Sequence, residues 1–120
     1  MRKATALLVG FVLLGAAVLP VNWAIAQQPV VTASNLTEMI KKAKTPADHE
    51  AIAAFYEREA ATNEEMAKIH RNSANIYAKP GMTAHCNNLA RDLRRAAAQD
   101  KALAAEHRAM AKTTAEKTGQ

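Results

Sequence analysis

Four histidines and a single cysteine are the residues of this chain best suited to chemistry. The histidines stand at positions 49, 70, 85 and 107, and the cysteine is Cys86. His49 and His70 are three heptads apart, as are Cys86 and His107, so each pair shares one heptad position if its stretch is helical. In an antiparallel helix pair, the residue numbers of two facing residues add up to a constant, and this sum is 156 both for 49 with 107 and for 70 with 86. The spacing therefore predicts that His49 faces His107 and that His70 faces Cys86.

These facing pairs predict two separate metal sites. Twenty-one residues of helix separate the two levels and span about 31 Å, too far for one ion. Met66 and Met82 stand one helical turn before His70 and Cys86, and Met110 lies close to His107. Thiolate, thioether and imidazole donors together suit copper first and zinc second. A closed zinc site takes four ligands, and a dimer could supply them if each chain contributed one facing pair of two ligands.

Other interpretations of the same residues stay open. Facing imidazoles could bind haem, but the chain has no Cys-x-x-Cys-His motif, so a haem would be non-covalent and ranks below copper and zinc. The histidines could instead be buried polar residues that fix the helix register, with the methionines filling the core. His85 lies one residue off the shared position and is expected to face solvent.

Catalysis has less support than binding. A nucleophile pair of Cys86 and His70 has no orienting third group and no evident substrate pocket in a thin hairpin, so we expect no enzyme. Tyr56 falls opposite Asp100, which predicts a hydrogen bond between the two helices.

Two long helices are predicted to hold these residues. Thr45 offers an N-cap hydroxyl, Pro46 a proline at the first helical position and Asp48 an acid in the first turn, which together predict a helix start. The next helix-breaking residues are Pro80 and Gly81. We expect a hairpin domain over 45–116, with a helix over 46–78, a turn over 79–82 and a helix over 83–114, followed by a tail over 117–120.

Alanines repeat every seven residues on both predicted helices. They are Ala53, Ala60, Ala67 and Ala74 on the first, and Ala90, Ala97, Ala104 and Ala111 on the second. Such stripes let two helices approach closely along a coiled-coil-like seam. The two helices also look like copies of one another at an offset of 37 residues, so that His70 aligns with His107. The predicted fold class is all-α, a long antiparallel α-hairpin.

One hairpin has little core, and domains of this size are marginal alone. The stretch 46–78 carries three basic against six acidic residues, and 82–116 carries six against four, which favours antiparallel partners. We expect a homodimer that forms a four-helix bundle. The alternative is a non-catalytic interaction protein whose open apolar face binds a partner or an unfolded chain, as an envelope chaperone would.

The first 26 residues have the pattern of a secretory signal peptide. Arg2 and Lys3 precede an apolar stretch over 6–19, and the small residues Ala24 and Ala26 predict cleavage after Ala26. An uncleaved membrane anchor is the alternative, although a span usually needs about 20 apolar residues. We expect a periplasmic or secreted protein with no stable membrane insertion after cleavage. An oxidising compartment makes the lone Cys86 notable, because no internal disulfide can form.

Residues 27–44 predict a polar leader that is loosely held. It contains a possible short helix over 36–44, and Asn35 and Glu38 have capping-box spacing. Removal of the signal peptide, with Arg2 and Lys3, lowers the formal net charge from +5 to +3. The mature chain has no block of like charges and few aromatic residues, so nucleic-acid binding has little support.

The stretch from Thr45 to Glu50, through Met82 to Cys86, to Glu106–Arg108 resembles small exported bacterial helical-hairpin proteins with repeated His and Ala heptads. The resemblance covers about two thirds of the mature chain and implies the fold and the compartment without an activity. In outline the chain is also similar to periplasmic hairpins that respond to metal or envelope stress. None of their specific motifs is matched, so no functional residue is carried over from them.

Overall fold

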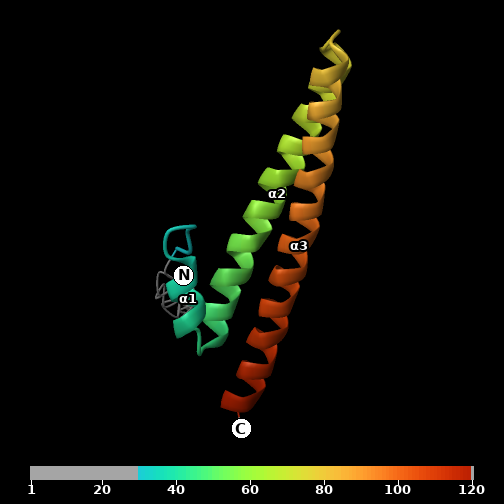
Figure 1. Cartoon of the computed structure of the whole chain (residues 1–120). Coiled ribbons are helices and arrows are strands. Elements are labelled where there is room, and N and C mark those ends of the chain that lie inside the picture. Colours follow the sequence, from blue (N-terminus) through green and yellow to red (C-terminus); the bar gives the residue numbers. More distant parts are fainter. Residues whose placement is uncertain (1–29, 120) are drawn as a thin grey trace, which may run out of the picture.

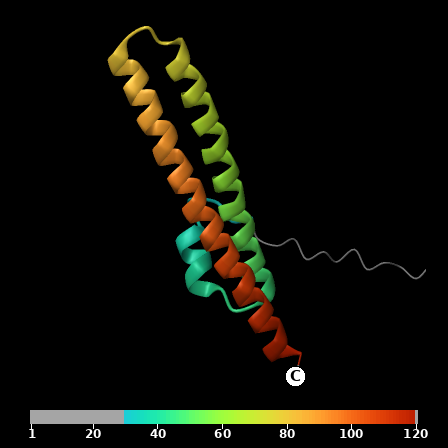
Figure 2. The same ribbon diagram turned by 90° about the vertical axis from the view of Figure 1, so that its right-hand side faces the viewer.

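The computed structural model describes residues 30–119, which form three helices and no strand. Helix α1 covers Leu36–Lys42, α2 covers Pro46–Ile76 and α3 covers Pro80–Thr118. Helices α2 and α3 lie side by side and antiparallel over their length, and α1 lies against the first half of α2 (Figures 1 and 2). The predicted all-α hairpin is confirmed. The predicted signal peptide and its cleavage point lie outside the described residues.

The beginning of α2 is fixed by the cap that its sequence predicts. Thr45 is the N-cap residue, and its Oγ1 accepts a hydrogen bond from the backbone N–H of Asp48 at 3.1 Å. The Asp48 carboxylate accepts in return from the backbone N–H groups of Thr45 and Lys44 at 2.9 and 3.0 Å. These bonds, the two from the backbone foremost, lower the pKa of Asp48. The reciprocal bonds satisfy N–H groups that have no partner within the helix.

The connection between α2 and α3 is shorter than predicted. Helix α2 ends at Ile76 rather than 78, and α3 begins at Pro80 rather than 83. Proline at the first helical position has no N–H to leave unpaired and already has a helical φ, so it begins α3 instead of extending the turn. Helix α3 then continues to Thr118, so the first two residues of the predicted tail, Lys117 and Thr118, are helical.

The alanine stripes form the seam between α2 and α3, as predicted. All eight stripe residues are buried. The heptad position between them holds the larger side chains, with His49, Tyr56, Asn63 and His70 on α2. On α3 the same position holds Cys86, Leu93, Asp100 and His107. Small residues alternating with larger, mostly polar ones let the helices come close while the polar groups meet across the seam.

The leader is held more firmly than its composition predicts. Val31 is only 2 % exposed and forms a core cluster with Ile52 and Phe55 of α2. Leu36 and Met39 pack against this cluster, because their spacing of three residues puts them on one face of α1. The prediction of a loosely held leader is wrong. One apolar face of a short helix is enough to hold it in place when the neighbouring helix offers aromatic and aliphatic side chains to pack against.

The capping box predicted for α1 does not form. Asn35 occupies the N-cap position but makes no side-chain hydrogen bond to the helix. Its Oδ1 accepts from the backbone N–H of Thr32 at 2.8 Å, and its Nδ2 donates to the carbonyl of Val30 at 3.0 Å. Asn35 therefore shapes the turn that leads Val31 into the core.

The hairpin has two flanks of different chemistry. Ion pairs cross the seam on one flank, between Glu64 and Lys101 and between Glu50 and Arg108. The opposite flank, which we call the apolar flank, carries the exposed side chains of Met66, Ile69, Leu103 and Met110. None of the described helices is long and apolar enough to cross a membrane.

Candidate metal-binding site

The predicted pairing of His49 with His107 is present at the open end of the hairpin. Their Nδ1 atoms lie 3.1 Å apart, and their ring centroids are 5.4 Å apart with the planes inclined by 36°. His49 is on the second turn of α2, directly after the capped start, and His107 comes from the second half of α3. One Nδ1 must carry a hydrogen and donate it, while the other accepts. The pair therefore shares one hydrogen, which is bonded to one Nδ1 and accepted by the lone pair of the other.

Burial makes His107 a poor base. It is 8 % exposed. Removal from water disfavours the charged imidazolium and lowers the pKa of His107, and the nearby His49 lowers it further, against a smaller opposing effect of Glu106. A neutral imidazole offers a lone pair, which is the form that binds metal ions.

Aromatic contacts fix the orientation of the His107 ring. Tyr56, one heptad after His49, stacks against it with centroids 6.1 Å apart and planes inclined by 26°. Phe55 in turn meets Tyr56 edge to face at 5.5 Å. Since Phe55 belongs to the core cluster under the leader, the leader supports the histidine pair through two aromatic rings.

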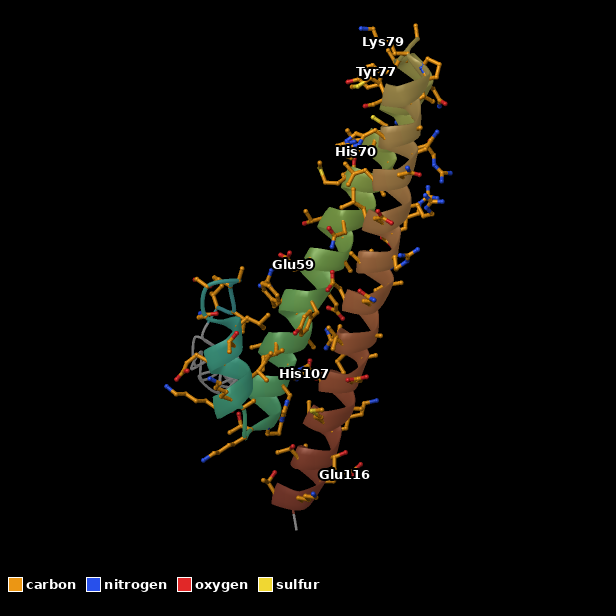
Figure 3. The ribbon with its side chains drawn as sticks, viewed as in Figure 1. Glu59, His70, Tyr77, Lys79, His107 and Glu116 are labelled. Atoms are coloured by element: carbon orange, nitrogen blue, oxygen red, sulfur yellow. The ribbon has the colours of Figure 1, made fainter. Side chains whose placement is uncertain are left out.

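Arg108 sets the rotation of α3 beside the pair. Its Nε and Nη2 donate to the two carboxylate oxygens of Glu57 at 2.9 and 2.8 Å, and its Nη1 also pairs with Glu50. The hydrogen bonds from Arg108 lower the pKa of Glu57 and raise that of Arg108. With Arg108 held on the flank, its neighbour His107 points into the seam (Figure 3). The sequence carries a signal for this contact, since Glu50, Glu57 and Glu64 recur every seven residues along one side of α2.

Asp100 has a different partner from the predicted one. Its Oδ2 accepts a hydrogen bond from Asn63 Nδ2 at 3.0 Å, while Tyr56 lies against His107. The predicted bond between Tyr56 and Asp100 is therefore wrong by one heptad. The reason is that Asp100 lies between Tyr56 and Asn63 in height along the hairpin. The rule that facing residue numbers add to a constant therefore does not decide which of the two it contacts.

The turn-proximal pair is less closely joined. Cys86 is 5 % exposed and His70 is half-buried, so both lie at the seam, yet no hydrogen bond joins them in the described structure. Within the described range 30–119, no group of three or more histidine, cysteine, aspartate or glutamate residues is arranged to hold a metal ion. The structure thus brings together one of the two predicted ligand pairs at bonding distance.

The methionines lie away from the seam. Met66, Met82 and Met110 are all exposed, and His85 is exposed as predicted. Sulfur donors were the reason to rank copper above zinc, and at the open end the donors that meet are two imidazoles.

Comparison with known proteins gave no match: no family model matches the sequence, and no match was found among the curated proteins or the solved structures. The chemistry of the histidine pair must therefore be inferred from its own geometry.

Proposed function

We propose that this is an exported helical protein of the periplasm that binds a copper or zinc ion between His49 and His107, for buffering, storage or delivery. The observation that carries the proposal is the 3.1 Å separation of the two Nδ1 atoms, on two helices whose rotation other contacts fix. A metal ion would take the place of the proton that the two nitrogens share.

The separation suits an ion that binds with tetrahedral angles. With metal–nitrogen bonds of about 2.0–2.1 Å, two ligands at a tetrahedral angle lie about 3.3–3.4 Å apart. The rings would need to separate by only a few tenths of an ångström from the observed 3.1 Å. Linear coordination would need about 4 Å and a larger movement of the helices. Haem is supported less, because a macrocycle does not fit between nitrogens so close together.

Copper stays ahead of zinc on the strength of the imidazole donors. A site with nitrogen ligands binds Cu²⁺ more tightly than Zn²⁺ in the usual order of divalent ions. The tetragonal geometry of Cu²⁺ fits as well, because neighbouring ligands at right angles with bonds of about 2.0–2.1 Å lie about 2.8–3.0 Å apart, close to the observed 3.1 Å. His70, Cys86 and the methionines Met66, Met82 and Met110 are further candidate ligands only if a metal ion draws them together.

The chain supplies two ligands at this level, so water or a second copy must supply the rest. The apolar flank formed by Met66, Ile69, Leu103 and Met110 is exposed. A homodimer that covers this flank in a four-helix bundle is part of the proposal, because exposed apolar side chains on one flank favour burial against a partner.

That flank also favours a second candidate function. A non-catalytic interaction protein would use the same exposed side chains to hold a protein partner or an unfolded chain, and the histidine pair would then serve to fix the helix register.

Calorimetric titration of the chain from Gln27 onward with Cu²⁺ and Zn²⁺ tests the metal proposal. His49→Ala and His107→Ala should each abolish the tightest binding event, because one imidazole cannot chelate. His85→Ala, which changes an exposed histidine near the turn, should leave it unchanged. Cys86→Ser separates the two levels, since it should remove only binding that depends on the thiolate.

Equal loss in all three histidine variants would point to non-specific binding and would contradict the proposal. Unchanged binding in His49→Ala and His107→Ala, with loss in Cys86→Ser, would move the site to the turn. No binding in any form would favour the interaction protein.

A further inference from the structure

Charge pairing stops halfway along the flank that carries the ion pairs, which we call the charged flank. Glutamates recur there every seven residues of α2, at 50, 57 and 64, and all three pair with basic residues of α3. The next residue of this series is Arg71, which is basic. On α3 the facing series places Arg94 seven residues before Lys101. Lys101 already pairs with Glu64, so no glutamate of the series remains for Arg94.

Four exposed basic side chains gather on the half of the charged flank nearest the turn. We call them the basic patch: Lys68, Arg71, Arg91 and Arg94. A hollow of about 450 Å³, lined by Glu64, Lys68 and Arg94, shows that side chains of both helices meet there. Since Arg94 lies at the level of Glu64, the patch extends over about seven residues of helix, or about 10 Å. Among residues 30–119, no ion pair neutralises the three arginines, and the pair of Lys68 with Glu65 is exposed and 3.5 Å long.

Like charges lie next to one another within the patch. Lys68 and Arg71 are three residues apart on α2, and so are Arg91 and Arg94 on α3. Neighbours at this spacing share one face of a helix, and like charges there destabilise it. Arg91 donates a hydrogen bond to Asn88, which leaves its charge in place. A bound anion would relieve this repulsion, as the ion pairs do on the rest of the flank.

The patch offers charge to a ligand but no apolar anchor. The other side chains that share its heptad positions on this half of the flank are small or polar: Ala61, Asn75, Ala78, Ala84, Asn87 and Ala98. Protein partners depend on buried aromatic and apolar anchors, and single-stranded nucleic acids stack on aromatic rings. Helices that bind a bilayer surface insert apolar side chains. On this flank the described residues supply none of these, so the ligand that fits best is an anion that needs only charge.

We infer that the basic patch binds a linear chain of phosphate groups, as in inorganic polyphosphate, which lies across the hollow with its oxygens on Arg71, Arg91 and Arg94. Arginine suits this ligand because its planar fork donates two parallel hydrogen bonds to one phosphate. One phosphate alone reaches only part of a patch about 10 Å long, so binding should depend on chain length. Glu64 at the edge of the hollow is paired with Lys101, which compensates its charge. The inference does not rest on the metal site, which lies at the open end of the hairpin.

The test is calorimetric titration of the metal-free chain from Gln27 onward with inorganic polyphosphate of defined length and with orthophosphate. Polyphosphate should bind more tightly than orthophosphate, and its binding should weaken as salt is raised. Arg91→Gln with Arg94→Gln should weaken polyphosphate binding about 5- to 30-fold, because each exposed charged contact contributes about two- to five-fold.

The matched control is Lys112→Gln with Lys117→Gln, which removes the same charge from the open end of α3. Lys112 is 18 residues from Arg94, about 27 Å along the helix and beyond the screening length of about 8–10 Å. The control should therefore leave the affinity unchanged within about two-fold. All four substituted residues are exposed, so circular dichroism should show unchanged helix content.

Thermal unfolding gives a second measurement. Without ligand, Arg91→Gln with Arg94→Gln should not lower the melting temperature, because the removed charges form no ion pair among the described residues. Polyphosphate should raise the melting temperature of the wild type more than that of this variant.

Equal losses of affinity in the patch and open-end variants would overturn the inference, because binding would then follow net charge. So would equal affinity for orthophosphate and polyphosphate. Tighter binding of polyglutamate, or of single-stranded or duplex DNA of the same charge, would also overturn it and would identify an acidic protein or a nucleic acid as the ligand.

Discussion

The histidine pair predicts a specific dependence of stability on pH. His107 has a pKa below its ordinary value of 6.5, mainly because burial disfavours its charged form. The unfolded chain then binds a proton that the folded chain does not, over the range between the lowered pKa and about 6.5. In that range the free energy of unfolding decreases as pH falls, and above it the contribution is complete.

One proton sets the size of the effect. A single group whose protonation differs fully between the two states gives a slope of about 1.4 kcal/mol per pH unit. This is a ceiling, because the pair sits at the open end of the hairpin and water screens part of the effect. The carboxyl groups with lowered pKa, such as Asp48 and Glu57, respond at more acid pH, below their ordinary values of about 4. Histidine effects are therefore separable above pH 5.

Urea unfolding followed by circular dichroism, at fixed protein concentration and without metal, measures the slope between pH 7.5 and pH 5. His107→Gln keeps a polar side chain but cannot titrate, so its slope should be flatter than that of the wild type by up to the stated ceiling. His85→Gln, an exposed site, is the matched control and should keep the wild-type slope. Identical slopes in wild type and His107→Gln, or stability that increases as pH falls, would refute the reasoning.

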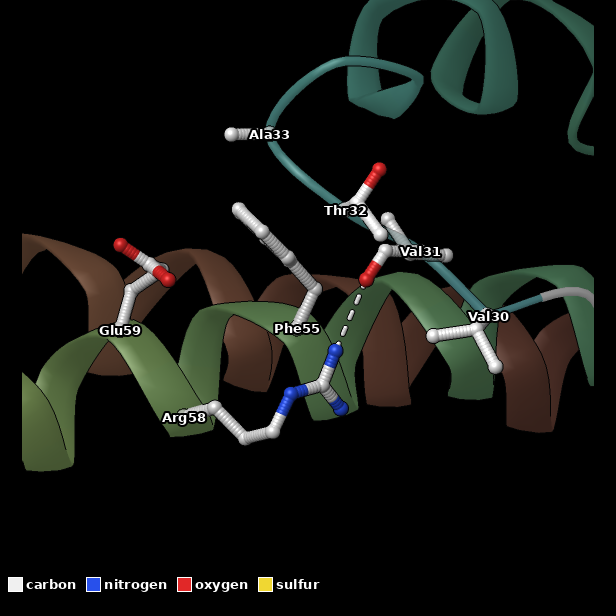
Figure 4. A pocket seen from close by; sticks show the side chains of 7 residues that line it. All are labelled: Val30, Val31, Thr32, Ala33, Phe55, Arg58 and Glu59. Atoms are coloured by element: carbon white, nitrogen blue, oxygen red, sulfur yellow. Dashed lines mark hydrogen bonds between the residues drawn. The ribbon is translucent and has the colours of Figure 1, made fainter.

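Three further predictions concern the scaffold. Ala60→Leu should cost about 1–3 kcal/mol of unfolding free energy by overpacking the seam, whereas Ala61→Leu on the exposed face should change it by less than about 0.5 kcal/mol in urea unfolding; equal effects would contradict the alanine seam. Val31→Ala should weaken the docking of the leader by about 1–2 kcal/mol and speed hydrogen exchange in α1, whereas Val30→Ala, at an exposed position, should not. The backbone carbonyl of Val31 also accepts a hydrogen bond from Arg58 at 2.9 Å (Figure 4). Unchanged hydrogen exchange in Val31→Ala would mean that this bond alone holds the leader. Arg108→Gln should lower the melting temperature slightly, by an amount that shrinks as salt is raised, and a loss independent of salt would exclude an ion-pair origin.

The hairpin could be predicted from local signals because each of them acts alone. The Thr45 cap, the alanines every seven residues and the break at Pro80 and Gly81 all point to the same two helices. The position of His49 opposite His107 followed from the same periodicity. Only the helix ends shifted, since proline can begin a helix as readily as it ends one.

The remaining features depend on contacts between parts of the chain that periodicity does not relate. Docking of Val31 on Ile52 and Phe55 depends on where the leader returns to α2, which no heptad specifies. The choice of Asn63 rather than Tyr56 as the partner of Asp100 depends on a difference of half a heptad in how the helices meet. Whether the side chains of His70 and Cys86 touch could not be predicted from their equal height along the hairpin, because side-chain direction decides whether two facing residues meet.

The most direct test of the metal site is anomalous diffraction from crystals of the chain loaded with Cu²⁺ or Zn²⁺. We predict one strong peak per chain between the Nδ1 atoms of His49 and His107, with metal–nitrogen distances of about 2.0–2.1 Å. A peak beside Cys86 and His70 alone, or no ordered peak in a chain whose two imidazoles still share a hydrogen bond, would contradict the proposed function.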